Sequence, residues 1–134
     1  MEIIDEKLLD ALTGLACNSP RLRMNHNFHE RLDAKAQRLL NALEPGTELP
    51  IHRHRHTAET YILLRGSLRV LFYNDSKELI ETALLNPLEG KFGIDIPAGQ
   101  WHTIEVLEPG TVIFEVKDGP YAPNSAEDVM SFEL

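Results

Sequence analysis

Residues 46–66 read GTELPIHRHRHTAETYILLRG, and this stretch decides the fold. It follows the spacing G-x5-H-x-H-x4-E-x6-G with every fixed position filled: Gly46, His52, His54, Glu59 and Gly66. Side chains two residues apart on a strand point to the same face, so we expect both imidazoles to aim at one point. Glu59 follows after a short turn, on a strand that the apolar residues 61–64 favour. The stretch therefore predicts two nitrogen ligands and one carboxylate for a metal ion.

A second stretch supplies another histidine. Residues 97–102 read PAGQWH, a Pro-x-Gly turn that delivers His102 onto a predicted strand at 102–107. A solvated basic patch is the plain alternative for the first stretch, but it requires neither a carboxylate at a set offset nor a further histidine after a tight turn. We predict four metal ligands: His52, His54, Glu59 and His102. His56 repeats the two-residue spacing but leaves only two residues before Glu59, so we place it behind the ligands or at the rim.

Composition limits the class of protein and its partners. The 134 residues suffice for one domain with its own core, and the formal net charge of -8 argues against nucleic acid or an anionic membrane as the main partner. Cys17 is the only cysteine, so no intrachain disulfide forms. The start of the chain lacks a signal-peptide pattern, and no apolar stretch is long enough to span a membrane. We expect a cytoplasmic protein.

The remaining pattern is that of an all-β protein with one short N-terminal helix. Residues 6–16 have apolar positions at helical spacing, with Asp5 as the N-cap. Period-two alternation between Gly and Pro turns predicts further strands at 20–29, 68–73, 78–85, 92–96 and 111–117. Residues 37–44 are compatible with helix or strand, and we choose strand. We expect a single domain over 1–134, with a helical segment at 1–18, a barrel at 19–120 and a peripheral tail at 121–134.

The two histidine stretches resemble the paired signature of the cupin superfamily, although Val106 stands where the second motif usually has Asn. The resemblance implies a double-stranded β-helix, or jelly-roll barrel, with the ligands inside and near its mouth. More of the chain is similar to the WbuC family of cupin-fold metalloproteins, in the stretches 19–29, 37–43, 52–56, 96–103 and 115–121. This resemblance implies a setting in surface-polysaccharide (O-antigen) metabolism and lipopolysaccharide biosynthesis, and assigns no reaction.

Candidate substrate-binding and catalytic residues lie outside the ligand set. Arg23, Asn25 and Asn27 share one face of the strand at 20–29, where they either meet solvent or bind a hydroxylated or anionic ligand. Trp101 either stacks on a sugar ring or fills the barrel end. Candidate bases are Tyr61, Glu115 and Lys117, for which a hydrogen-bonded wall residue or a surface charge is the alternative.

Three functions are compatible with this ligand set. Three imidazoles and one carboxylate suit one divalent ion of Fe, Mn, Ni, Zn or Co. The first function is a metal-dependent isomerase, epimerase or lyase acting on a sugar, a sugar nucleotide or a sugar-derived intermediate. The second is a non-catalytic protein that binds or senses a small polar ligand, and the third is an Fe(II)-dependent dioxygenase. By analogy with the fold, we also expect a homodimer.

Overall fold

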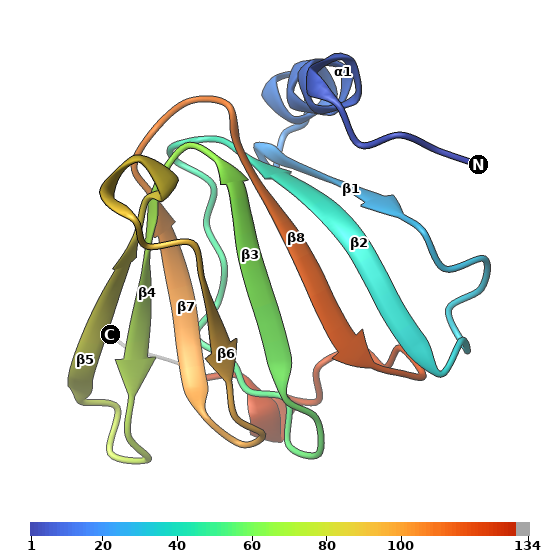
Figure 1. The fold of residues 1–134 in the computed structure, drawn as a ribbon. Coiled ribbons are helices and arrows are strands. Elements are labelled where there is room, and N and C mark those ends of the chain that lie inside the picture. The colour runs from blue at the N-terminus through green and yellow to red at the C-terminus, as the bar shows by residue number, and fades with distance from the viewer. Residues whose placement is uncertain (131–134) are drawn as a thin grey trace.

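The computed structural model describes residues 1–130 as two antiparallel β-sheets with one N-terminal α-helix (Figure 1). The larger sheet has the order β1-β2-β8-β3-β6 and the smaller one the order β5-β4-β7. The bounds of the elements are α1 Glu6–Cys17, β1 Arg23–Asn27, β2 Ala36–Leu43, β3 Glu59–Arg65, β4 Leu68–Tyr73, β5 Leu79–Leu85, η1 Pro87–Glu89, β6 Gly93–Ile96, β7 Trp101–Val106, β8 Thr111–Asp118 and η2 Ala126–Asp128. This arrangement confirms the predicted all-β jelly roll with its short helix. Residues 131–134 of the predicted tail lie outside the described residues.

The core between the sheets comes from the alternating apolar positions of the strands. Leu63, Val70 and Ile104 are among its buried members, each contributed by a different strand. The ambiguous segment at 37–44 is strand, as chosen, because β2 pairs antiparallel with β8 along its whole length. Pairing on both edges of β2 satisfies its backbone groups, and this outweighs the helical preference of its Leu and Ala residues.

Helix α1 covers the outer side of the larger sheet beside β1 and β2 (Figure 1). Asp5 caps it as predicted, since its carboxylate accepts a hydrogen bond from the Leu8 N–H at 3.0 Å. The buried face of the helix, with Leu9 and Leu12, packs on Leu40 and Val112 of the sheet. The helix is therefore a packing element on the far side of the sheet from the core between the sheets.

The segment that holds His52 and His54 is not a regular strand, which corrects one prediction. Pro50 precedes it without an N–H to donate, and His52 forms only isolated bridges, to His102 on one side and to Val129 on the other. Regular pairing starts only at Glu59, the first residue of β3. The two histidines still reach one point, because backbone hydrogen bonds with His102, Gly99 and Asp128 anchor the segment from both sides.

Residues 121–127 of the predicted peripheral tail are exposed, and the three residues after them are partly buried. The tail lies along the histidine segment: the Arg53 N–H donates to the Asp128 carbonyl at 3.0 Å, and the Met130 N–H donates to the Ile51 carbonyl at 2.8 Å. Figure 1 shows the red η2 at the end of the sheets where β3 begins and β8 ends. Within residues 1–130, no helix is long and apolar enough to cross a membrane.

Candidate metal centre

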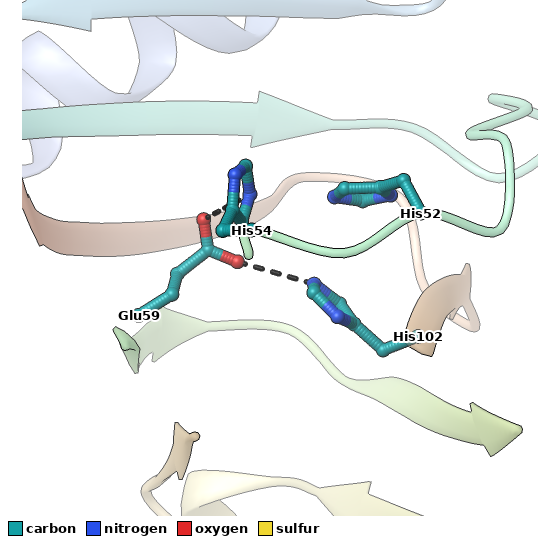
Figure 2. Close-up of side chains that lie close together, drawn as sticks. All are labelled: His52, His54, Glu59 and His102. Atoms are coloured by element: carbon teal, nitrogen blue, oxygen red, sulfur yellow. Dashed lines mark hydrogen bonds and ion pairs between the residues drawn. The ribbon is translucent and has the colours of Figure 1, made fainter. Parts of the chain in front are cut away.

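Four side chains converge where β3 begins: His52, His54, Glu59 and His102 (Figure 2). One potential ligand atom from each lies within 4.8 Å of all the others. The Glu59 carboxylate links two of the histidines, with His54 Nε2 at 3.2 Å and His102 Nε2 at 3.2 Å. The structure thus brings together all four predicted ligands, from a loop, the start of β3 and the start of β7.

Backbone hydrogen bonds hold the two histidine stretches against each other. His52 and His102 exchange both of their backbone hydrogen bonds, at 3.0 and 2.9 Å. The Gly99 N–H, in the predicted Pro-x-Gly turn, donates to the His54 carbonyl at 2.8 Å. The spacing of the ligands is therefore fixed by main-chain geometry rather than by the side chains alone.

Carbonyl groups also orient two of the rings. His52 Nδ1 lies 2.9 Å from the Pro50 carbonyl oxygen, and His102 Nδ1 lies 2.9 Å from the Gln100 carbonyl oxygen. A carbonyl oxygen can only accept, so each Nδ1 carries a proton, and Nε2 is the ring nitrogen that faces the cluster. This arrangement, in which a backbone group behind the ring selects the tautomer, is common among metal-binding histidines.

The charge states of the cluster suit a cation. Burial alone would raise the pKa of Glu59, but hydrogen bonds with His102 and His54 outweigh it and hold the pKa well below its usual range. Burial, together with the neighbouring His102, lowers the pKa of His52 to about 4. Near neutral pH the cluster therefore offers an ionised carboxylate and a neutral imidazole, which are the forms that bind metal.

The four residues fit a divalent transition metal. Zn–N and Zn–O bonds of about 2.0–2.2 Å place ligand atoms roughly 3 to 4.4 Å apart around a shared ion, close to the spacing found here. The mixed nitrogen and oxygen set is of borderline softness and suits Fe, Mn, Ni, Zn or Co, without selecting one of them.

Two of the candidate catalytic residues lie behind Glu59 on neighbouring strands. The Tyr61 hydroxyl donates to Glu59 Oε1 at 2.5 Å, and burial raises its pKa well above the usual value. Cross-strand pairing sets Tyr61 opposite Glu115, whose carboxylate accepts from Asn41 Nδ2 at 3.2 Å. Burial, reinforced by the charge of Glu59, raises the pKa of Glu115 to about 7.

Lys117, the third candidate, lies closer to the surface of the site. It is paired across the strands with Glu59, and its Nζ is 4.0 Å from Glu59 Oε2. Its side chain also lines a pocket of about 380 Å³ beside the metal cluster, together with His54 and His56. His56 is exposed there, on the rim rather than among the ligands.

The predicted polar face of β1 does not meet the metal cluster. Arg23 donates to Thr47 Oγ1 at 3.3 Å and to the Glu48 carbonyl at 2.9 Å, and it lines a separate pocket of about 290 Å³. Asn25 and Asn27 are exposed.

Trp101 is buried, and its surroundings account for its position. Its Nε1–H donates to Asp75 Oδ1 at 2.8 Å, and the Arg53 guanidinium lies 4.4 Å from the centre of its ring. The guanidinium covers one face of the indole, a favourable cation–π contact.

The sequence reasoning missed three residues beside the site: Arg53, Arg55 and Asp128. Asp128 Oδ1 accepts from Arg53 Nε at 2.9 Å and from Arg55 Nη2 at 2.9 Å, which ties the tail to the histidine segment. The alternation of Arg with His at 52–56 was a signal that basic groups accompany the ligands. Nothing in the local sequence pointed to Asp128, which lies more than seventy residues further along the chain.

Three solved structures share this fold at low sequence identity. KdgF from Halomonas sp. is 16% identical over 78% of this chain and 83% of its own, with a TM-score of 0.58. The capsular polysaccharide assembling protein CapF from Staphylococcus aureus is 21% identical over 74% of this chain, with a TM-score of 0.60, and this chain spans 27% of its length. The cupin domain of Cnp3 from Schizosaccharomyces pombe is 11% identical over 72% of this chain and 64% of its own, with a TM-score of 0.57.

At these identities the likeness shows a shared fold, that of the Cnp3 cupin domain. No curated protein matches the chain in a sequence search. One family model, described as a domain of unknown function (DUF6016), matches residues 4–85, which include three of the four clustered ligands. Since the match covers more than half of the 134 residues, the chain belongs to this DUF6016 family.

Proposed function

We propose that the chain is a metal-dependent enzyme acting on a sugar or a sugar-derived intermediate, by isomerase, epimerase or lyase chemistry. The observation that carries this proposal is the oriented cluster of three histidines and Glu59 beside a pocket of about 380 Å³. His52, His54, Glu59 and His102 would hold a divalent ion, which would supply Lewis-acid chemistry toward a substrate carbonyl.

The residues around the cluster have complementary roles. Tyr61 holds the Glu59 carboxylate in place through its hydroxyl, and His52 and His102 are oriented by the carbonyls behind them. Glu115, with a pKa of about 7, can hold or release a proton near neutral pH, as a general acid or base must. Lys117 places a positive charge between the ligands and the pocket.

The cellular setting is part of the proposal. The chain resembles the WbuC family in several stretches, and one protein that shares its fold is named as a capsular polysaccharide assembling protein. Both resemblances support a role in surface-polysaccharide metabolism, such as O-antigen synthesis.

Turnover tests the proposal. Metal-loaded protein is incubated with a panel of sugar nucleotides and sugar acids, and products are followed by mass spectrometry and NMR. We expect turnover of at least one substrate class, lost on chelation and in Glu59→Gln. A metal-replete protein that is inactive on the whole panel contradicts the enzymatic proposal.

One observation favours a second candidate, a binding protein without catalysis. Of the three candidate catalytic residues, only Lys117 lines the pocket, whereas Glu115 is hydrogen-bonded to Asn41 and Tyr61 to Glu59. For this candidate we expect a ligand to raise the melting temperature of the metal-loaded protein with no product formed.

A further inference from the structure

The pocket beside the metal cluster shares one residue with the cluster, His54. Its lining comes from the histidine segment on one side, including His54, and from Lys117, residues 118–124 and Asp128 on the other. His54 belongs both to this lining and to the predicted ligands. A ligand in the pocket therefore lies directly against the metal centre.

The charges that line this pocket are unlike those of the whole chain. The chain carries a formal net charge of -8, yet the pocket is lined by Arg53, Arg55 and Lys117 against two acids, Asp118 and Asp128. Asp128 is already engaged, because both arginines and Ser125 donate to its carboxylate. Asp118 is the last residue of β8 and is exposed, so water screens its charge. Among the lining residues the basic groups therefore outnumber the acids by three to two, and the further partners of the arginines, Asp75 at 3.9 Å from Arg53 and Glu127 at 3.5 Å from Arg55, stand outside the lining.

The Lys117 ammonium group can donate hydrogen bonds to a ligand in the pocket. Among the described residues its one close anionic partner is Glu59, at 4.0 Å, which is longer than a hydrogen bond. Its side chain is only 18% exposed, so its ammonium group is held between the ligands and the pocket. Arg55 stands on the facing wall, where Asp128 binds its Nε and Nη2 at 3.1 and 2.9 Å. That contact orients the guanidinium, and no residue within 1–130 is hydrogen-bonded to Nη1.

We propose that this pocket binds the anionic group, a phosphate or a carboxylate, of a polyhydroxylated ligand whose remaining oxygens face the metal centre. Arg and Lys are the side chains best suited to such oxyanions. The pocket adjoins the metal centre at His54, so one small ligand reaches both sites. This inference rests on the proposed function, because it assigns the substrate class of the same site: a sugar acid or a sugar phosphate rather than a neutral sugar.

The experiment is an NMR titration of the full chain, both metal-free and loaded with diamagnetic Zn²⁺. Inorganic phosphate, glucuronate and glucose are added separately at constant ionic strength, so that general screening does not change. We expect saturable shifts of the amide signals at 54–57 and 117–119 with at least one of the two anions, and none with glucose. The anion that binds more tightly distinguishes a sugar phosphate from a sugar acid.

Matched variants decide whether these side chains hold the anion. Lys117→Gln and Arg55→Gln are each expected to weaken binding about tenfold, the loss of roughly one charge-assisted hydrogen bond. Lys117→Arg should keep the affinity, and so should Lys91→Gln, which removes an exposed charge in the turn between η1 and β6. The same spectra report whether each variant is folded.

Two results overturn the proposal: no saturable shift with either anion in either form of the protein, or binding that neither Lys117→Gln nor Arg55→Gln weakens. Neither result involves turnover. A failure here therefore leaves the metal-dependent enzyme standing, and a failure to find turnover leaves the anion pocket standing.

Discussion

Three groups behind the metal ligands fix their geometry: the Pro50 carbonyl, the Gln100 carbonyl and the Tyr61 hydroxyl. The two carbonyls accept hydrogen bonds from Nδ1 of His52 and of His102, and the Tyr61 hydroxyl donates to the Glu59 carboxylate. The side chains of His52, His102 and Glu59 are thereby restrained, which reduces the entropy lost if an ion binds.

Glu115 gives a prediction for pH at the residue scale. Its pKa in the folded protein is raised from 4.5 to about 7, so folding favours the protonated carboxyl. A raised carboxyl pKa contributes stability that is complete below the unfolded value and is lost as pH rises through about 7. We expect the metal-free wild type to lose stability relative to Glu115→Gln between pH 5 and pH 8, measured by urea unfolding. Parallel curves for the two proteins across this range would contradict the prediction.

That His52, His54, Glu59 and His102 lie close together could be predicted from the sequence, because the spacing of His and Glu positions reflects a local geometry. Their partners could not be. Asn41 bonds to Glu115 and Asp128 bonds to Arg53, and in each pair the two residues lie more than seventy positions apart. The local sequence around Asn41 and Asp128 carries no sign of these contacts. The pairing of Arg53 with Trp101 was hidden for the same reason.

At the scale of elements, alternation and turn residues were enough to predict most strands and the helix. The segment at 51–56 was the exception, since alternation alone does not show that a strand partner is missing. Gly66, the last fixed position of the G-x5-H-x-H-x4-E-x6-G spacing, has a φ of +85° between β3 and β4. A Cβ at this position would collide with Thr111, including its backbone Cα.

Gly66→Ala should therefore destabilise the fold strongly. The left-handed backbone alone costs Ala about 1 kcal/mol, and the collision with a buried β8 residue adds to it, for a total of roughly 3 kcal/mol. Gly90→Ala is the matched control, because Gly90 also has a positive φ but no atom within 4 Å of the added Cβ. Equal free energies of unfolding for the two variants, measured in urea, would show that the contact with Thr111 is unimportant.

The second prediction at the scale of elements concerns Asp128, which holds the tail against the histidine segment. Hydrogen bonds from Arg53 and Arg55 lower its pKa to about 2. The ionised carboxylate therefore contributes stability that is complete above the unfolded pKa of 3.8 and is lost as pH falls through about 2. Asp128→Asn should speed hydrogen exchange at the Arg53 and Met130 amides, which bond between the tail and the histidine segment. Glu127→Gln, whose carboxylate is exposed and 3.5 Å from Arg55, should leave exchange unchanged.

The exchange difference also has a predicted pH dependence. It should be constant above pH 4 and shrink below it, as the wild-type carboxyl is protonated and comes to resemble the amide. A difference that persists undiminished to pH 2 would mean that the carboxylate charge does not hold the tail.

At the scale of the whole molecule, the cupin fold could be predicted because motif, strand pattern and turn residues all agreed. The formal net charge of -8 gave no sign of the basic residues that line the pocket, since a net charge does not report where the charges lie. Residues 119–124 and Asp128, which follow β8, supply half of the pocket lining, so the pocket depends on how the tail folds back beside the histidine segment.

Metal binding should stabilise the whole domain. An ion that binds only the folded chain adds about 2.7 kcal/mol at a free concentration of 100 times its Kd. For a chain of this size that corresponds to a rise of roughly 10 °C in Tm. Calorimetry with and without Zn²⁺ measures the rise, and His102→Ala should abolish it. An equal rise in that variant would place the bound ion elsewhere.

The central claim, that His52, His54, Glu59 and His102 form a metal centre, is tested most directly by metal content. Protein purified without a histidine tag is analysed by plasma mass spectrometry, together with His54→Ala and Glu59→Ala. We predict close to one transition-metal ion per chain in the wild type and almost none in either variant, with circular dichroism showing that all three proteins are folded. A wild-type protein that binds no metal, even after reconstitution with each candidate ion, would contradict the claim.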